Sequence, residues 1–183
     1  YTWMIANYNI SPETYVEYVG RDHKAEDYPD YIFTPDNFNE ETHTYHPHRI
    51  YKKARGVIPT ICLELVSKRD EIKYSMGQFE ISDPDKYIQM YLEQYALKTD
   101  GNSIYGILSF FLSRYYSWHL GDSVTTCCQD VIKKSYIKLE EWGYTVIGGD
   151  TDSTFVLLNG KGPKEIDKLF AEYYKELMKE YNV

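Results

Sequence analysis

Two carboxylates one residue apart, Asp150 and Asp152, are the feature of this sequence best suited to chemistry. They lie in the run Gly149-Asp150-Thr151-Asp152-Ser153. Carboxylates this close repel each other unless a cation, hydrogen-bond donors or water offset the charge, and Mg²⁺ prefers oxygen ligands of this kind. The alternative is a solvated turn, because Asp and Gly are both common turn residues. The pair therefore indicates either a divalent-metal site or an ordinary turn.

A second group of polar side chains recurs at helical spacing in the middle of the chain: Arg69, Lys73, Lys98, Asn102 and Tyr105. At about 100° per residue, Arg69 falls inside the apolar stripe of its predicted helix, whereas a solvated charge would face away from it. Buried Arg is rare unless it is paired. The alternatives are snorkelling along apolar surface or a salt bridge with Glu71 or Glu93. If the two helices pack antiparallel, the basic side chains converge on one polyanion, and a triphosphate is the natural candidate.

Three histidines, His43, His46 and His48, lie close together in a Tyr-rich segment. A zinc site normally needs four ligands, and no convincing fourth ligand accompanies them. The spacing favours a surface loop over a metal site.

These side chains depend on a small set of predicted elements. Apolar residues at helical spacing predict one helix over Val57–Met76 and a second from about Lys86 to Phe111, with Ile88, Tyr91, Leu92 and Tyr95 as its apolar stripe. A short polar turn joins the two into an antiparallel hairpin.

Further helices and strands are predicted downstream. Asp122 is a good N-cap for a helix that runs to about Trp142. Two β-prone runs, 144–147 and 154–158, flank the Asp pair and predict a β-hairpin. A final amphipathic helix covers Pro163–Tyr181, and the stretch up to about Arg55 predicts loops and short strands.

Composition narrows the function classes. The chain has 183 residues, with 28 acidic and 20 basic side chains and a net charge of −8. This argues against a protein that coats nucleic acid non-specifically and against adsorption to anionic membranes. Residues 51–76 nevertheless carry six bases against three acids, so positive charge is concentrated in this segment, which leads into the predicted hairpin and includes its first helix.

Cysteine usage and hydropathy bear on location. Three cysteines, two of them adjacent, make a poor disulfide framework and indicate reduced thiols. No apolar run approaches the roughly 20 residues that span a bilayer, and no signal peptide opens the chain. We expect a cytoplasmic, nuclear or virus-encoded intracellular protein that is neither secreted nor membrane-bound.

Four segments occur in an order that resembles family B DNA polymerases. Lys98-Thr-Asp-Gly-Asn102-Ser-Ile-Tyr105-Gly106 is similar to that family's Lys-x-x-x-Asn-Ser-x-Tyr-Gly motif, and Gly149 to Ser153 to its Gly-Asp-Thr-Asp-Ser motif. Tyr1 to Thr14 resembles the end of the first motif and the segment after it. Ser67-Lys-Arg69-Asp-Glu-Ile-Lys73 is similar to the Lys/Gln-Arg-x-x-x-Lys stretch of the fingers helix.

The resemblance implies an α+β fold, an antiparallel-sheet polymerase palm with an inserted two-helix fingers hairpin. Residues 1–55 would form the N-terminal part of the palm, 56–108 the fingers, and 109–183 the rest of the palm with the Asp-Thr-Asp hairpin. The implied partners are primer-template DNA, deoxynucleoside triphosphates, and the exonuclease and thumb regions of a longer parent chain. Two Mg²⁺ ions are the implied cofactors.

The resemblance also implies a role for each matching residue. Asp150 and Asp152 would bind the catalytic metals. Lys98, Arg69 and Lys73 would hold the incoming triphosphate, and Asn102 would line the nucleotide site. Tyr105 would contact the base pair on its minor-groove side, and Tyr1 would pack under the deoxyribose and disfavour a ribose 2′-hydroxyl.

Departures from the family pattern leave a second hypothesis open. Thr2-Trp3 stands where the family usually has Pro-Ser, and Gly148 where a larger residue commonly stands. The first motif's Asp would lie five residues before Tyr1, so we expect residues 1–183 alone to be inactive. The alternative is a non-catalytic nucleotide- or DNA-binding scaffold, or one partner of a split polymerase.

Overall fold

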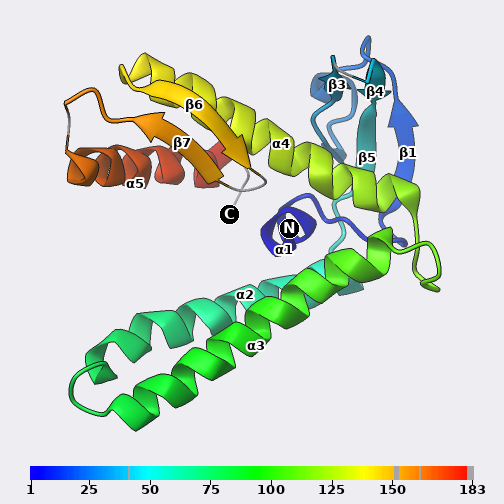
Figure 1. Ribbon diagram of the computed structural model, residues 1–183. Coiled ribbons are helices and arrows are strands. Elements are labelled where there is room, and N and C mark those ends of the chain that lie inside the picture. The colour runs from blue at the N-terminus through cyan, green and yellow to red at the C-terminus, as the bar shows by residue number, and fades with distance from the viewer. Residues whose placement is uncertain (41, 151–152, 161, 181–183) are drawn as a thin grey trace. The chain divides into compact units, whose positions relative to one another are not determined.

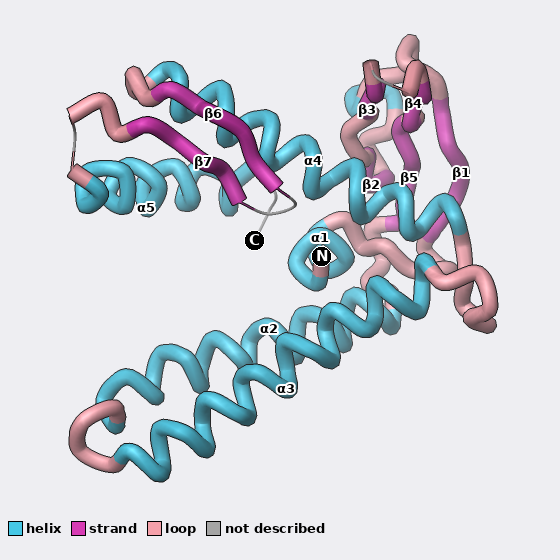
Figure 2. The backbone as a smooth tube through the Cα atoms, viewed as in Figure 1, coloured by secondary structure: helices cyan, strands magenta, loops and turns pink. Residues whose placement is uncertain are grey.

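The computed structural model of the protein describes residues 1–40, 42–150, 153–160 and 162–180. The chain divides into two compact units, Tyr1–Thr126 and Cys127–Val183. Both units combine helices with antiparallel strands, as Figure 1 and Figure 2 show. The predicted mixture of helix and antiparallel sheet is therefore present.

The first unit contains a three-stranded antiparallel sheet and a separate β-hairpin. The sheet has the order β1-β5-β2, and its strands are β1 (Tyr15–Val19), β5 (His48–Lys52) and β2 (Tyr31–Phe33). The hairpin pairs β3 (Asn37–Asn39) with β4 (Thr44–His46), and one 3-10 turn, η1 (Ala25–Asp27), lies between β1 and β2. Three consecutive residues of β5, Arg49, Ile50 and Tyr51, are buried, so both faces of this central strand are covered. The predicted short strands of this region are confirmed.

A six-residue helix near the start of the chain, α1 (Thr2–Asn7), was not expected from the sequence. So short a helix is not stable by propensity alone. It is held by packing of the buried Ile5 and Ala6. Just beyond it, the buried Asn9 donates from Nδ2 to the carbonyls of Lys52 and Ala54, at 2.7 and 2.8 Å. These bonds fix the end of α1 to the chain that enters the next helix.

The predicted helical hairpin is confirmed as α2 (Val57–Met76) and α3 (Pro84–Ser109), which run side by side in Figure 1. A 3-10 turn, η2 (Gly77–Phe79), follows α2 directly. Asp83 caps α3 by accepting a 3.1 Å hydrogen bond from the Lys86 N–H, and Pro84 occupies the first turn, where its missing N–H is tolerated. The helix therefore begins two residues earlier than predicted.

The predicted inner face of α3 is wrong. The four residues of the expected apolar stripe are all exposed: Ile88, Tyr91, Leu92 and Tyr95. The buried positions of the helix are Gln94, Gly101 and Leu108. Gly101 explains part of the difference, because a Cβ there would lie 2.6 Å from Thr2 Oγ1. The face of α3 that lies against α1 therefore carries a glycine at the contact in place of a large apolar side chain. A search for apolar residues at helical spacing does not identify such a face.

The third long helix, α4 (Trp118–Glu141), begins before the predicted cap. The Ser117 carbonyl accepts hydrogen bonds from the N–H groups of Leu120 and Gly121, at 3.1 Å each. Asp122 thus lies inside the helix, and the prediction that it is the N-cap is wrong. Its carboxylate is instead engaged by Arg49 and His46 from the strands.

The second unit is a two-stranded hairpin with helices. Strand β6 (Thr145–Asp150) pairs antiparallel with β7 (Ser153–Leu157), which confirms the predicted hairpin. The final helix, α5 (Pro163–Glu180), covers the predicted range as far as it is described; Tyr181 lies outside the described residues. The Trp142 ring meets the rings of Phe170 and Tyr173 edge-on, with centroids 5.4 and 5.9 Å away. This aromatic cluster anchors α5 within the unit.

The structure adds two observations on hydropathy and cysteine. No helix in the described part of the chain is both long enough and apolar enough to cross a bilayer. All three cysteines are thiols, and Cys62 and Cys127 are buried. Burial raises the pKa of the Cys62 thiol to about 11, so it stays protonated at neutral pH.

Candidate functional site

Arg69 lies half-buried on α2 and is bound by an uncharged partner. Its Nε donates to Gln94 Oε1 of α3 at 3.2 Å. The neighbouring Lys68 forms an ion pair with Glu93 at 3.5 Å. The sequence-based alternative of a salt bridge from Arg69 to Glu71 or Glu93 is therefore wrong. Because an amide carries no charge, this partner does not offset the positive charge of Arg69.

Lys98 and Asn102 share one open hollow on α3. Its volume is about 400 Å³, and its other lining residues are Tyr95, Thr99 and Ser103. The two hydroxyls of Thr99 and Ser103 are used within the helix, where each donates to the carbonyl four residues earlier. The Lys98 ammonium and the Asn102 amide are then the lining groups best able to donate to an anionic ligand.

Lys73 follows Arg69 by one helical turn on α2 and is exposed. Within the described ranges, no hydrogen bond or ion pair joins it to Lys98 or Asn102. Of the predicted triphosphate-binding residues, Lys98 thus shares the α3 hollow with Asn102, and Arg69 is joined to α3 through Gln94. Lys73 is exposed on α2 and does not line that hollow.

Tyr1 and Tyr105 are brought together by the contact of α1 with α3. Their rings stack with centroids 4.3 Å apart and planes 24° apart. The Gly101–Thr2 approach described above permits this arrangement, because a side chain at Gly101 would displace the Thr2 side chain or α1 itself. Tyr1 and Tyr105 were predicted to belong to one site although they are far apart in the sequence. In the structure the two side chains are neighbours.

A second hollow, of about 390 Å³, includes Tyr105 in its lining. It is lined by residues of β4, α3, α4 and the loop between the two helices: Thr44, His46, Tyr105, Ser109, Tyr116, Trp118, Gly121, Asp122 and Thr125. Sequence reasoning placed only Tyr105 of these at a site.

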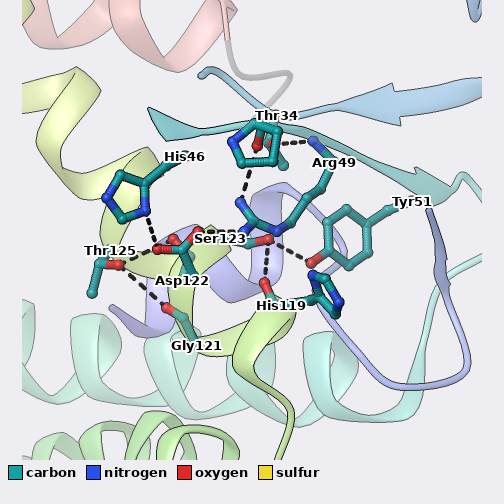
Figure 3. A network of polar contacts seen from close by, with 10 residues as sticks. Thr34, His46, Arg49, Tyr51, His119, Gly121, Asp122, Ser123 and Thr125 are labelled. Carbon is teal, nitrogen blue, oxygen red and sulfur yellow. Dashed lines mark hydrogen bonds and ion pairs between the residues drawn. The ribbon is translucent and has the colours of Figure 1, made fainter. Parts of the chain in front are cut away.

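Two residues that line this hollow, His46 and Asp122, belong to an ionic network drawn in Figure 3. Arg49 is fully buried and forms an ion pair with the Asp122 carboxylate. The other oxygen of that carboxylate is hydrogen-bonded to His46 Nδ1 at 2.6 Å. The Arg49 guanidinium also lies over the Trp118 ring, 4.9 Å from its centroid. Nearby, burial and the Arg49 charge both lower the pKa of His119.

The network corrects the interpretation of the histidines. His46 ends β4 and His48 begins β5, and both are half-buried rather than in a surface loop. His48 Nδ1 bonds to the Thr34 carbonyl at 2.8 Å. Across the described residues there is no group of three His, Cys, Asp or Glu side chains that could hold a metal ion. The sequence carried no signal for this network, because His46 and Asp122 are 76 positions apart.

The hairpin that carries the Asp pair is described up to its tip. Asp150 is opposite Ser153 in the β6–β7 ladder, but the side chain of Asp150 and all of Asp152 lie outside the described residues. A side chain at Gly149 has no room, since a Cβ there would overlap the Tyr136 hydroxyl and lie 2.6 Å from the Ser153 carbonyl oxygen. At Gly148, where the resemblance leads one to expect a larger residue, a Cβ would meet open space.

Comparison with known proteins identifies the family. The sequence matches the DNA polymerase family B model over residues 1–182. The DNA polymerase alpha catalytic subunit of Xenopus laevis is 33% identical over 128 residues, which are 70% of this chain and 9% of that protein. The DNA polymerase of Pyrococcus glycovorans is 31% identical over 157 residues, which are 80% of this chain and 20% of that protein.

A solved structure agrees with these relatives. The family B DNA polymerase from the hyperthermophilic archaeon Pyrobaculum calidifontis is similar with a TM-score of 0.66 and 29% identity, over 96% of this chain and 20% of that one. The chain thus spans between 9% and 20% of the length of these proteins. Because the family match covers nearly every residue, the chain belongs to DNA polymerase family B.

Proposed function

We propose that this chain is the palm and fingers portion of a template-directed DNA polymerase. Residues 1–55 and 109–183 contribute to the palm, and residues 56–108 form the fingers. The observation that carries the proposal is the shared face of α3: Lys98 and Asn102 line one hollow, and Tyr105 follows on the same helix, stacked on Tyr1. A cationic group, an amide and an aromatic wall in that order suit a triphosphate, a sugar and a base.

The hairpin would bind the incoming deoxynucleoside triphosphate. Lys98 and Arg69 offer charge-assisted hydrogen bonds to phosphate oxygens, and Lys73 adds positive charge on α2. Asn102 is a neutral donor one helical turn beyond Lys98, at a suitable place for the sugar or the inner phosphates. The partner of Arg69 is neutral and does not offset its charge, which supports this role.

The aromatic pair would recognise the sugar and the new base pair. The Tyr1 ring is held in place by stacking on Tyr105. A ribose 2′-hydroxyl would therefore clash with a ring that cannot easily move aside. Tyr105 would contact the minor-groove edge of the base pair. Sequence choice itself comes from pairing with the template strand.

The Asp pair fits a hard divalent cation by its donor chemistry. Two carboxylates are concentrated at one hairpin, and Asp150 closes the described ladder there. Asp150 and Asp152 would hold Mg²⁺ together with the first-motif Asp that the resemblance assigns five residues before Tyr1. When bound, two Mg²⁺ ions activate the primer 3′-hydroxyl and neutralise charge on the phosphates.

The reaction is attack by the primer 3′-oxygen on the α-phosphorus of the nucleotide. A new phosphorus–oxygen bond forms, the bond to pyrophosphate breaks, and the hydroxyl proton is released to solvent. Lys98 and Arg69 would stabilise the charge that accumulates on the departing pyrophosphate. The primer-template DNA and the remaining regions of a longer polymerase, exonuclease and thumb among them, are the proposed partners.

Template-directed extension tests the proposal. The full-length protein, meaning the longer polymerase proposed to contain this chain, is incubated with Mg²⁺, a labelled primer and four templates. The templates differ only in the first templating base. We expect addition of the complementary deoxynucleotide on each template and a loss of at least about a hundredfold in Asp152→Asn, as for removal of an electrostatic group at a reaction centre. Asp22→Asn, an exposed carboxylate on the first unit, is the matched control. Binding of nucleotide or DNA without extension would favour the scaffold hypothesis instead.

A further inference from the structure

Gln94 is a buried polar residue in the interface between α2 and α3. Only 7% of it is exposed, and the other buried positions of these two helices are Pro59, Cys62, Ile72, Gly101 and Leu108. Burying an amide in an apolar interface costs free energy unless it is hydrogen-bonded. Leu or Met would fill the same space without that cost, so the amide calls for an explanation beyond packing.

The hydrogen bond that Gln94 makes has a defined direction. Arg69 Nε can only donate, so the group that faces it must be the Gln94 amide oxygen, and the separation is 3.2 Å. The contact uses the inner edge of the guanidinium. Among the described residues no partner is recorded for Nη1 or Nη2, the two nitrogens that form the outer fork of Arg69.

The geometry of α3 connects this contact with the nucleotide-binding hollow. Gln94, Lys98 and Asn102 are spaced four residues apart, and each step of four advances slightly more than one turn, or about 6 Å, along the helix. Lys98 and Asn102 line the hollow, and Gln94 precedes them by one turn on the side that faces α2. Arg69 is therefore tied to the helix that carries the other proposed phosphate ligands.

We propose that Gln94 is a positioning residue for nucleotide binding: it holds Arg69 by Nε so that the outer fork of the guanidinium is presented to the triphosphate. This rests on the proposed function. A flexible Arg loses side-chain entropy when it binds a ligand, and a preformed bond to Gln94 removes part of that loss in advance. A neutral partner suits this task, since a carboxylate in its place would cancel the charge that attracts the phosphate.

The test is a double-mutant cycle on the full-length protein with primer-template DNA. Single-turnover incorporation at varied deoxynucleotide concentration separates the nucleotide Kd from the maximal rate. Gln94→Met removes the acceptor and keeps the buried volume. We expect the nucleotide Kd to rise about fivefold with the maximal rate changed less than twofold, because one hydrogen bond to a charged group is lost.

The second half of the cycle separates positioning from a structural role. In an Arg69→Ala background, Gln94→Met should change the Kd by less than twofold, because the side chain it acts through is absent. An equal loss in both backgrounds would overturn the proposal and assign Gln94 to hairpin stability. Gln94→Glu keeps an oxygen acceptor but adds a negative charge that offsets that of Arg69, so it should also raise the Kd. A Kd equal to that of the parent would count against the need for a neutral partner.

Matched controls keep the result interpretable. Leu97→Met is a volume-conserving change on the same helix and should leave the Kd and the thermal unfolding temperature within error. If Arg69→Ala itself does not weaken nucleotide binding, the proposed triphosphate role of Arg69 fails. If Arg69→Ala weakens it and Gln94→Met does not, only the positioning role of Gln94 fails.

Discussion

Tyr1 and Tyr105 stack face to face with their ring centroids 4.3 Å apart, although they come from the first residue of the chain and the last third of α3. The contact joins the end of the segment that resembles the first polymerase motif to the motif that contains Lys98 and Asn102. The two rings thus form a continuous aromatic surface within the first unit.

Loss of the stack should relax sugar discrimination. Removal of Tyr105 leaves Tyr1 without its stacking partner, and such a pair is worth about 0.5–1.5 kcal/mol. We expect Tyr105→Ala to reduce the preference for deoxy- over ribonucleotides by roughly twofold to tenfold, whereas Tyr105→Phe keeps the preference. Competitive incorporation of dNTP and rNTP measures the ratio. An unchanged ratio in Tyr105→Ala would show that Tyr1 is fixed by other contacts.

Gly101 should resist substitution despite its place in a helix. Ala normally stabilises a helix interior by about 0.5–1 kcal/mol relative to Gly. Here the added Cβ would lie 2.6 Å from Thr2 Oγ1 and 3.1 Å from its Cγ2, so the Thr2 side chain or α1 itself must shift. We expect Gly101→Ala to lower the unfolding free energy, and Thr2→Ala added to it to restore most of the loss. A single mutant more stable than the parent in chemical denaturation would contradict the packing described.

The Arg49–Asp122 pair should be a strong determinant of stability. Arg49 is fully buried, so removal of Asp122 leaves a charge with no acidic partner in the interior. We expect Asp122→Ala to cost about 3–5 kcal/mol in denaturant unfolding. The control is Glu141→Gln, which removes an exposed ion pair with Lys138 and should cost less than about 1 kcal/mol. Equal effects of the two substitutions would refute the assignment.

Glu13 should make stability depend on pH in the acid range. Burial raises its pKa, but hydrogen bonds from the Ser11 hydroxyl and the Val57 N–H outweigh burial, and the pKa is lowered overall. The folded protein therefore holds the proton less tightly than the unfolded chain. The stabilising contribution is present above the unfolded pKa of about 4.3 and is lost as pH falls through the folded pKa.

Unfolding free energies measured from pH 7 to pH 3 test this directly. The parent should exceed Glu13→Gln at neutral pH, by about 1 kcal/mol or less as for a carboxylate at a helix N-terminus, and the gap should close at acid pH. A gap that stays constant across the range would mean that Glu13 acts by packing alone.

Local sequence patterns were sufficient to predict where the helices and strands lie, but not which side of a helix is buried. Val57–Met76 was predicted with the bounds that the structure has, because helix punctuation is a local property. The inner face of α3 was not, since Gly101 and the Arg69 contact of Gln94 depend on partners from elsewhere in the chain.

The candidate site shows the same division. Lys98, Asn102 and Tyr105 follow from one contiguous motif, and the structure brings Tyr105 against Tyr1. The Arg49–Asp122–His46 network joins strands to a distant helix, and Asp122 resembled a helix cap because capping is the commonest local use of Asp. The ion pair of Asp122 with the distant Arg49 thus decides its place in the structure, rather than the local preference of Asp for a helix cap.

In the proposed function, the Lys98 face of α3 binds the triphosphate of an incoming nucleotide. Single-turnover incorporation by the full-length protein, at varied nucleotide concentration, tests it most directly. Lys98→Ala should raise the nucleotide Kd about tenfold or more, as for loss of a charged hydrogen bond, while Lys68→Ala, which removes the exposed ion pair with Glu93, should change it less than twofold. Equal effects of the two substitutions, or no effect of Lys98→Ala, would contradict the claim.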